Sequence, residues 1–217
     1  MLAARDAFLA GGHFAPIATA LIEAIAPSTA TVVDVGAGTG WYLAAVLDAL
    51  PGARGLALDA SKYAARRASR AHPRARAVVC DTWTSLPVRD GSADLVLDVF
   101  APRNGAEMAR VLAPGGQLLV VTPTERHLAE LAEPLGLLAV DPLKRDRLTS
   151  ELAPLMATAT TQIEFAMPLD RAAVRALAAM GPWARHGEPT DRDVAITDLP
   201  EPVEVTASVL LTRFVGR

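Results

Sequence analysis

A glycine-rich turn stands beside acidic residues in the first quarter of the chain. The turn reads Gly36-Ala37-Gly38-Thr39-Gly40, and Asp34 lies two residues before it. Glycines let a backbone approach a ligand closely. Carboxylates attract cations and accept hydrogen bonds from hydroxyl and amino groups. Asp34 and the later Asp59 therefore favour a small polar ligand that carries a positive charge.

The sequence of this turn does not fit either of two common classes of phosphate-binding site. A dinucleotide site needs a third small residue where Trp41 stands, because the helix must pack closely on the strand. Asp34 would also repel a pyrophosphate at the start of the following helix. A phosphate loop needs a lysine followed by serine or threonine after a longer loop, and the sequence has neither.

S-adenosylmethionine agrees with the turn, since it is a zwitterion with a sulfonium cation and no phosphate. Asp34 would attract its amino end, and Asp59 would accept from both ribose hydroxyls. Asp81 and Thr82 follow the next strand, where an acceptor would meet the adenine amino group. Structural roles stay open for these acids: Asp34 could brace the loop, and Asp81 could cap a helix.

Strands and helices alternate along the first 122 residues. Apolar and β-branched runs predict strands at 31–35, 55–59, 75–80, 94–98 and 117–122, and helical spacing predicts helices at 14–26, 41–50, 62–71 and 107–112. Such alternation predicts an α/β fold with a doubly wound parallel sheet. The carboxyl ends of the strands, which carry the glycine turn and the acids, should meet in one crevice.

The second half of the chain is less regular. We expect helices at 126–132, 144–152 and 171–180, and strands at 162–167 and 203–214, which would bring the sheet to seven strands with an antiparallel edge strand. We expect a single domain over 1–217. Within it, 1–27 would form a helical lid segment, 28–123 the donor-binding core, and 124–217 a half with substrate-side elements.

Composition limits the partners and the compartment. The 21 Lys and Arg stand against 24 Asp and Glu, a net charge of −3, so any nucleic-acid surface must be local. Five arginines gather between Arg66 and Arg76, as a solvated helix face or as an RNA patch. Cys80 is the only cysteine, which excludes an internal disulfide and favours a reducing, cytoplasmic setting. No apolar run is long enough to span a membrane.

Several segments together resemble the catalytic domain of the bacterial 23S ribosomal RNA (guanine-N1-)-methyltransferase family, which includes macrolide-resistance enzymes. The resemblance covers most of the chain and rests on residues 4–16, 33–42, 58–62, 100–102, 107–116, 122–128 and 180–183. It implies a Rossmann-like class I methyltransferase fold, S-adenosylmethionine as methyl donor, and antibiotic resistance as a biological setting.

The resemblance also assigns residues. It implies donor contacts for Phe14, Gly38, Thr39 and His127, with Asp59 on the ribose. Ala60 lies in the matching segment after the second strand, beside that acid. The family carries an N-terminal zinc module that has no counterpart in this sequence. Two explanations are open: a shortened chain, or a natural relative without the zinc module. We therefore expect no metal site in this chain.

The methyl acceptor is the open question. Guanine N1 carries a proton, and Asp98, at the end of the fourth strand, is the best-placed carboxylate to accept it, although a structural hydrogen bond would explain it equally well. The first hypothesis is methylation of guanine N1 in ribosomal RNA. The alternatives are a small-molecule methyltransferase and a donor-binding protein without catalysis. The sequence also leaves a homodimer open.

Overall fold

The computed structural model describes residues 1–136, 150–180 and 189–216. The chain forms two compact units, which are treated separately below. Unit 1 comprises Met1–Pro16, Pro123–Pro142 and Gln162–Val209, and unit 2 comprises Ile17–Thr122, Leu143–Thr161 and Leu210–Arg217. None of the described helices is long and apolar enough to cross a membrane.

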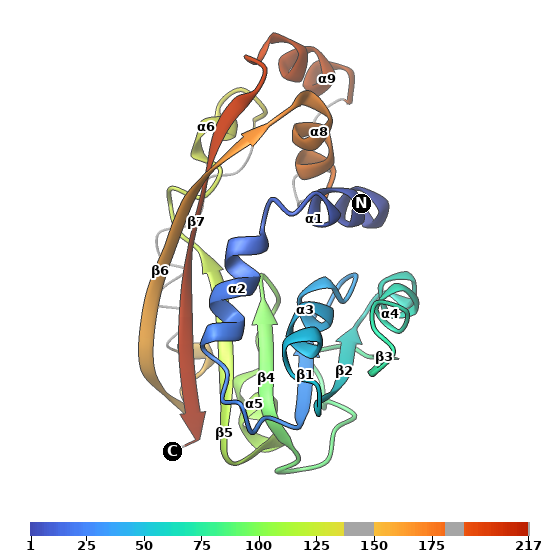
Figure 1. The fold of residues 1–217 in the computed structure, drawn as a ribbon, viewed down its shortest axis with the longest axis vertical. Coiled ribbons are helices and arrows are strands. Elements are labelled where there is room, and N and C mark those ends of the chain that lie inside the picture. The colour runs from blue at the N-terminus through green and yellow to red at the C-terminus, as the bar shows by residue number, and fades with distance from the viewer. Residues whose placement is uncertain (137–149, 181–188, 217) are drawn as a thin grey trace. The chain divides into compact units, whose positions relative to one another are not determined.

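A seven-stranded sheet organises unit 2, with the strand order β3-β2-β1-β4-β5-β7-β6 (Figure 1). Its strands are β1 (Thr31–Val35), β2 (Arg54–Asp59), β3 (Ala75–Val79), β4 (Ala93–Val99), β5 (Leu112–Pro123), β6 (Leu155–Leu169) and β7 (Val203–Gly216). The first five strands pair in parallel. β7 runs opposite to β5 and β6, and the chain of β6 and β7 continues into unit 1 (Figure 1).

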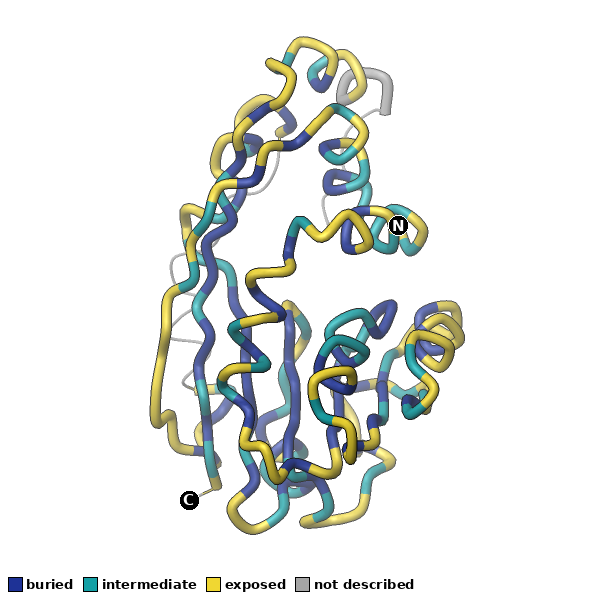
Figure 2. The backbone as a smooth tube through the Cα atoms, in the orientation of Figure 1, coloured by how far each residue is buried: buried dark blue, intermediate teal, exposed yellow. Residues whose placement is uncertain are grey.

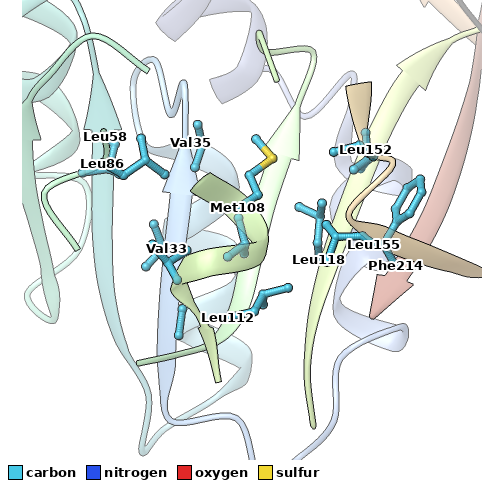
Figure 3. Close-up of a cluster of buried hydrophobic side chains, with 14 residues drawn as sticks. Val33, Val35, Leu58, Leu86, Met108, Leu112, Leu118, Leu152, Leu155 and Phe214 are labelled. Carbon is cyan, nitrogen blue, oxygen red and sulfur yellow. The ribbon is translucent and has the colours of Figure 1, made fainter. Parts of the chain in front are cut away.

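Helices cover the sheet because its central strands are apolar on both faces. In β1 and β4 nearly every residue is buried, as the dark tube in Figure 2 shows. On one face α5 (Gly105–Val111) places Met108 among Val33, Val35 and Leu118 (Figure 3). Each such buried side chain contributes about 1.5–3 kcal/mol by leaving water.

On the other face α3 (Trp41–Ala49) lies close to β2. A Cβ added at Gly55 would lie 2.8 Å from Leu43 and 2.9 Å from Leu47, so the absent side chain lets helix and strand approach. α4 (Lys62–Ala68) packs on β2 and β3, and α2 (Ala15–Glu23) precedes β1. Helices on both faces give the doubly wound arrangement that alternation predicted.

Unit 1 contains four helices among its described residues: α1 (Leu2–Ala10), α6 (Ala129–Ala132), α8 (Arg171–Met180) and α9 (Pro189–Asp198). α1 packs against α8. The amphipathic α8 buries Val174, Leu177 and Ala178, as its helical spacing requires. Arg171 at its start pairs with Glu201 at 2.5 Å.

The predicted fold class is confirmed, and the differences lie in the second half and at the ends. β6 begins at Leu155, seven residues before the predicted strand, and α6 keeps only part of the helix predicted at 126–132. α1 lies within the helical lid segment predicted at 1–27, although its bounds were not predicted, and α9 was not predicted. The helix predicted at 144–152 and the segment 180–183 fall mainly outside the described residues.

Candidate active site

The glycine turn follows β1 at the carboxyl edge of the sheet. Gly36, Gly38 and Gly40 have φ of 70°, 56° and 77°, in the left-handed region that side chains disfavour. The N–H groups of Gly36 and Ala37 donate to the Leu58 carbonyl at 2.8 and 3.1 Å, which ties the turn to β2. Thr39 is buried within the turn. The backbone conformation thus favours glycine at all three positions, and close neighbours leave no room for a Cβ at Gly36 and Gly40.

Asp59 ends β2 and holds the turn directly. Its Oδ2 accepts from the Gly38 N–H at 2.8 Å, and its Oδ1 accepts from the Ser61 N–H at 2.8 Å. Each carboxylate oxygen has a second lone pair for a further donor. The carboxylate is therefore oriented before any ligand arrives, and it can still accept from two hydroxyl groups. Ala60, the next residue, is exposed.

Asp34 lies within β1, with Ala57 and Leu97 as its partners on the two neighbouring strands. Its side chain is almost fully buried. Burial, together with the nearby Asp59 carboxylate, raises the pKa of Asp34 from 3.8 to about 8. At neutral pH the acid is mostly protonated, and a cation placed beside it would favour its ionised form. Its surroundings thus suit a positively charged ligand.

Asp81 and Thr82 begin a loop that α5 holds in place. Oδ1 of Asp81 accepts from the Trp83 N–H at 3.0 Å, while Thr82 is buried. The Asn104 side-chain amide donates to the Trp83 carbonyl at 3.0 Å, and Glu107 accepts from the Leu86 N–H at 2.7 Å. Asp81 closes a local turn instead of capping a long helix, and its second oxygen accepts no hydrogen bond from the described residues.

Asp98 is the last residue but one of β4, and its side chain is fully buried. Burial raises the pKa of Asp98 well above its usual range, and Arg103 opposes the shift. Arg103 Nη1 lies 3.9 Å from Oδ1 of Asp98, and its Nε donates to Glu151 at 3.0 Å. The Ala101 N–H faces the carboxyl and also lowers its pKa, but neither oxygen has a hydrogen-bond partner of normal geometry among the described residues.

The face of β4 on which Asp98 lies bears on its role. Side chains alternate along a strand, so Asp98 shares a face with Val96, and Val96 belongs to the core cluster of Met108. The assignment of Asp98 as proton acceptor stays a prediction. The ion pairs with Arg103 offer a second interpretation, in which Asp98 holds the segment after β4.

That segment touches the glycine turn. A Cβ added at Gly36 would lie 2.5 Å from the Cβ of Ala101. The preceding residue, Phe100, has φ of 57°, which is unusual for an aromatic side chain, and 37% of its surface is exposed. Strained residues of this kind gather at functional sites, where the surrounding structure fixes them. The glycine turn and the loop after β4 therefore form one packed assembly.

Phe14 and His127 lie together in unit 1. Their ring centroids are 5.8 Å apart, and Phe14 also packs edge-on against Phe8 at 5.1 Å. His127 Nδ1 accepts from the Ser208 N–H at 3.2 Å, which fixes the orientation of the imidazole. The structure thus brings together two of the residues to which the family resemblance assigns donor contacts. Their contact with the donor stays a prediction.

Arg103, Glu151 and Ala101 were missed by sequence reasoning. Glu151 meets Arg103 only because a segment 48 positions later packs on the start of α5. A Cβ at Gly105 would lie 2.0 Å from the Glu151 carbonyl oxygen. An asparagine followed three residues later by a glutamate, as in Asn104 and Glu107, is a local signal for the start of α5.

Comparison with known proteins decides the family. A family model described as a methyltransferase domain matches residues 32–116. The chain is 48% identical to a putative 23S rRNA (guanine-N(1)-)-methyltransferase of Micromonospora griseorubida, over 99% of this chain and 79% of the relative. The chain belongs to the 23S ribosomal RNA (guanine-N1-)-methyltransferase family. It is an S-adenosylmethionine-dependent methyltransferase with the predicted fold.

A second relative in this methyltransferase family is the 23S rRNA (guanine(748)-N(1))-methyltransferase of Streptomyces fradiae. It is 48% identical over 98% of this chain and 78% of its own length. Among solved structures, a putative methyltransferase of Anabaena variabilis superposes with a TM-score of 0.65 at 16% identity, over 92% of this chain and 96% of its own. That likeness shows the fold alone.

A methyltransferase of Geobacter sulfurreducens, solved in complex with S-adenosyl-L-homocysteine, superposes with a TM-score of 0.56 at 16% identity, over 95% of this chain and 91% of its own. Within the part of the chain that the structure describes, no group of three His, Cys, Asp or Glu side chains is arranged to hold a metal ion.

Proposed function

We propose that this methyltransferase transfers a methyl group from S-adenosylmethionine to N1 of a guanine in 23S ribosomal RNA, in the cytoplasm. One observation carries the proposal: the 48% identity to two proteins named for this reaction extends over 98–99% of the chain. A shared donor site alone would match only the part of the chain that the general methyltransferase model covers, residues 32–116.

The donor would lie at the carboxyl ends of β1 and β2. Gly36, Gly38, Thr39 and Gly40 would pass close to its methionine part, and Asp59, beside Ala60, would accept from the ribose hydroxyls. Asp34 would face its positive charge, and Asp81 and Thr82 would meet the adenine. The free lone pairs of Asp59 and the raised pKa of Asp34 support this placement. Phe14 and His127 are further donor contacts in this proposal.

The donor supplies an electrophilic methyl group, and the transfer is an in-line displacement at carbon. Positioning of the two reactants accounts for much of the acceleration of such a step. The chain supplies a turn fixed by Asp59 and a loop after β4 that packs on it through Ala101. A carboxyl with a raised pKa, such as Asp98, is a better proton acceptor than an ordinary one once it is ionised.

Labelled S-adenosylmethionine tests the proposal. The protein is incubated separately with 23S ribosomal RNA, with ribosomes and with a metabolite extract, and the label is mapped. We expect label at N1 of a guanine in 23S RNA. Label in small molecules alone would contradict the RNA acceptor and favour the small-molecule enzyme. Donor binding without transfer to any fraction would favour a binding protein.

A further inference from the structure

The segment between Asp59 and Asp81 is strongly basic in an acidic protein. Residues 60–80 contain six Lys and Arg and no Asp or Glu, whereas the rest of the chain has 15 Lys and Arg against 24 Asp and Glu. The structure places this segment on α4 and on β3, the edge strand of the sheet. Positive charge is therefore concentrated at one place in unit 2.

The basic side chains of this segment point outward, with one exception. α4 buries Ala64, Ala65 and Ala68 against the sheet. Its other side, together with the following turn, exposes a set that we name the basic face: Lys62, Tyr63, Arg66, Arg67 and Arg70. Arg76 is also exposed, but it lies on the opposite face of the sheet, because its partner on β2 is Leu56, which packs on the α5 side. Arg74 is the exception, because its guanidinium donates to the carbonyls of Leu47, Leu50 and Ala53.

Three cations of this face lack an acidic partner among the residues that the structure describes. Lys62, Arg66 and Arg70 make no ion pair with any carboxylate in the described part of the chain. Like charges four residues apart, as at Lys62 and Arg66, destabilise a helix. A helix that keeps such an arrangement against its own stability is suited to an external anion with several charges.

An aromatic ring accompanies the charges. Tyr63 is 67% exposed, and the Lys62 ammonium lies 5.2 Å from the centre of its ring. Exposed aromatic rings among lysines and arginines are typical of surfaces that bind nucleic acid, where rings stack on unpaired bases and cations meet phosphates. A surface that bound only a single phosphate would have no use for a large exposed ring.

The basic face is also connected to the donor site. The N–H of Ser61, just before α4, donates to Asp59 at 2.8 Å. A Cβ added at Gly40 would lie 2.9 Å from the Cα of Ala68, so the buried side of α4 rests on the donor turn. A polyanion held on the outer side of this short helix is thereby held beside the methyl donor.

We propose that the basic face on α4 and the turn after it binds the phosphate backbone of the RNA acceptor. The inference rests on the proposed function, since it takes RNA as the acceptor. It assigns RNA binding to residues outside the donor site and explains how a chain with net charge −3 engages a polyanion: the charge is concentrated and not spread. Phosphate contacts give affinity and orientation, while the guanine itself is selected elsewhere.

The test compares RNA binding by charge variants at several salt concentrations. The probe is a hairpin of 23S ribosomal RNA containing the guanine 748 for which the Streptomyces fradiae relative is named. In the variant Arg66→Gln/Arg70→Gln, the change at Arg66 preserves helix propensity, since arginine and glutamine are similar helix formers, and Arg70 lies in the turn after α4. We expect its affinity for the hairpin to fall about tenfold at low salt. The slope of log affinity against log salt should drop by about 1.4–1.8, as expected for two lost phosphate contacts.

Arg54→Gln is the matched control, because Arg54 is exposed at the opposite end of β2. The control and the double variant should both bind S-adenosylmethionine like the parent, which shows that the donor site is intact. If the double variant has the same RNA affinity and salt slope as the parent, RNA binding by the basic face is contradicted. The proposed function still holds in that case, provided that the parent methylates guanine N1. If the parent binds no RNA, both proposals fail. A third outcome is possible, in which the double variant loses RNA binding and the parent does not methylate guanine. This outcome would support the basic face and contradict the proposed reaction.

Discussion

The Gly38 N–H donates to Oδ2 of Asp59 at 2.8 Å, so the acid at the end of β2 holds the glycine turn at the end of β1. Its other oxygen accepts from Ser61 at the start of α4. One side chain thus positions three elements, and the same side chain is the proposed ribose acceptor. Loss of this carboxylate removes ligand contacts and the order of the turn together.

Asp59→Ala should weaken binding of S-adenosylmethionine by at least about 30-fold, because hydrogen bonds to a charged group contribute about 1.5–3 kcal/mol each. Isothermal titration calorimetry measures the change. Asp94→Ala is a matched control, since Asp94 Oδ2 also accepts two backbone N–H groups, from Ala30 and Thr31, at the amino end of β1. Equal donor affinity in the two variants would contradict the assigned role of Asp59.

Donor binding should depend on the protonation of Asp34. The pKa of Asp34 is raised to about 8 in the free protein, so the acid is mostly neutral at pH 6 and ionises as the pH rises. A cationic donor favours the ionised acid, and affinity should therefore increase up to about tenfold per pH unit between pH 6 and 7.5.

Two observations check the dependence on Asp34. Calorimetry at pH 7 in buffers of different ionisation enthalpy should show release of up to one proton on binding. Asp34→Asn should bind with a weaker affinity that is nearly independent of pH in this range. A parent protein that shows neither proton release nor a pH slope would refute the electrostatic role of Asp34.

Gly36→Ala should weaken donor binding for two separate reasons, an unfavourable backbone conformation and a steric clash. The residue has φ of 70°, which costs an L-amino acid about 1–2 kcal/mol, and its new Cβ would lie 2.5 Å from that of Ala101. The double variant Gly36→Ala/Ala101→Gly removes only the second cost. We expect thermal unfolding and donor titration to show partial recovery in the double variant. No recovery would mean that the contact with Ala101 does not matter.

Asp98→Asn separates the two roles that the structure allows for this carboxyl. If Asp98 positions the loop after β4 through Arg103, the variant should lose methyl transfer and stability together, with an unchanged pH profile, and Arg103→Gln should show a similar loss. We expect this outcome, because the side chain is fully buried and Arg103 Nη1 lies 3.9 Å away. A kcat loss with normal stability and a changed pH profile would instead support a proton acceptor.

Glu107 should contribute to stability at neutral pH and lose this contribution in acid. The hydrogen bond from Arg110 lowers its pKa from 4.5 to about 2 in the folded protein. The stabilisation is present above pH 4.5 and disappears as the pH falls towards 2. Glu107→Gln should cost about 1–2 kcal/mol at pH 7 and much less at pH 2.5, as measured by urea unfolding.

Asp90→Asn is the comparison for Glu107, since Asp90 also pairs with Arg110 but its side chain is 79% exposed. Exposed ion pairs contribute less than about 1 kcal/mol. A Glu107 variant whose stability loss is the same at both pH values would contradict the assignment. The Leu86 N–H donates to Glu107. Faster hydrogen exchange at this N–H in the variant would show that the loop after β3 is no longer held in place.

The first half of the fold was predictable because its signals are local. Short β-branched runs such as Thr31–Val35 form strands that are buried on both faces, and the glycine turn and Asp59 mark where two of them end. The second half lacks such signals. β6 is exposed over most of its first ten residues, so its sequence has little of the apolar alternation that identifies a strand.

The candidate site divides in the same way. Asp34, Asp59 and the glycines could be proposed as donor contacts because residues suited to the chemistry coincide with strand ends in the sequence, and these contacts stay predictions. Arg103 and Glu151 were not found, since their pairing depends on a segment 48 residues away. The burial of Asp98 was also hidden, because alternation along β4 places it on the α5 side only once the register with β1 is known.

The close approach of Gly36 and Ala101 links two positions that are 65 residues apart in the chain. Neither can accept a larger side chain while the other stays as it is. Among natural relatives, the side-chain volumes at these two positions should therefore vary together, with their sum kept small. An alignment of such sequences should show this covariation. A relative with a bulky residue at either position should have a different backbone conformation in its glycine turn.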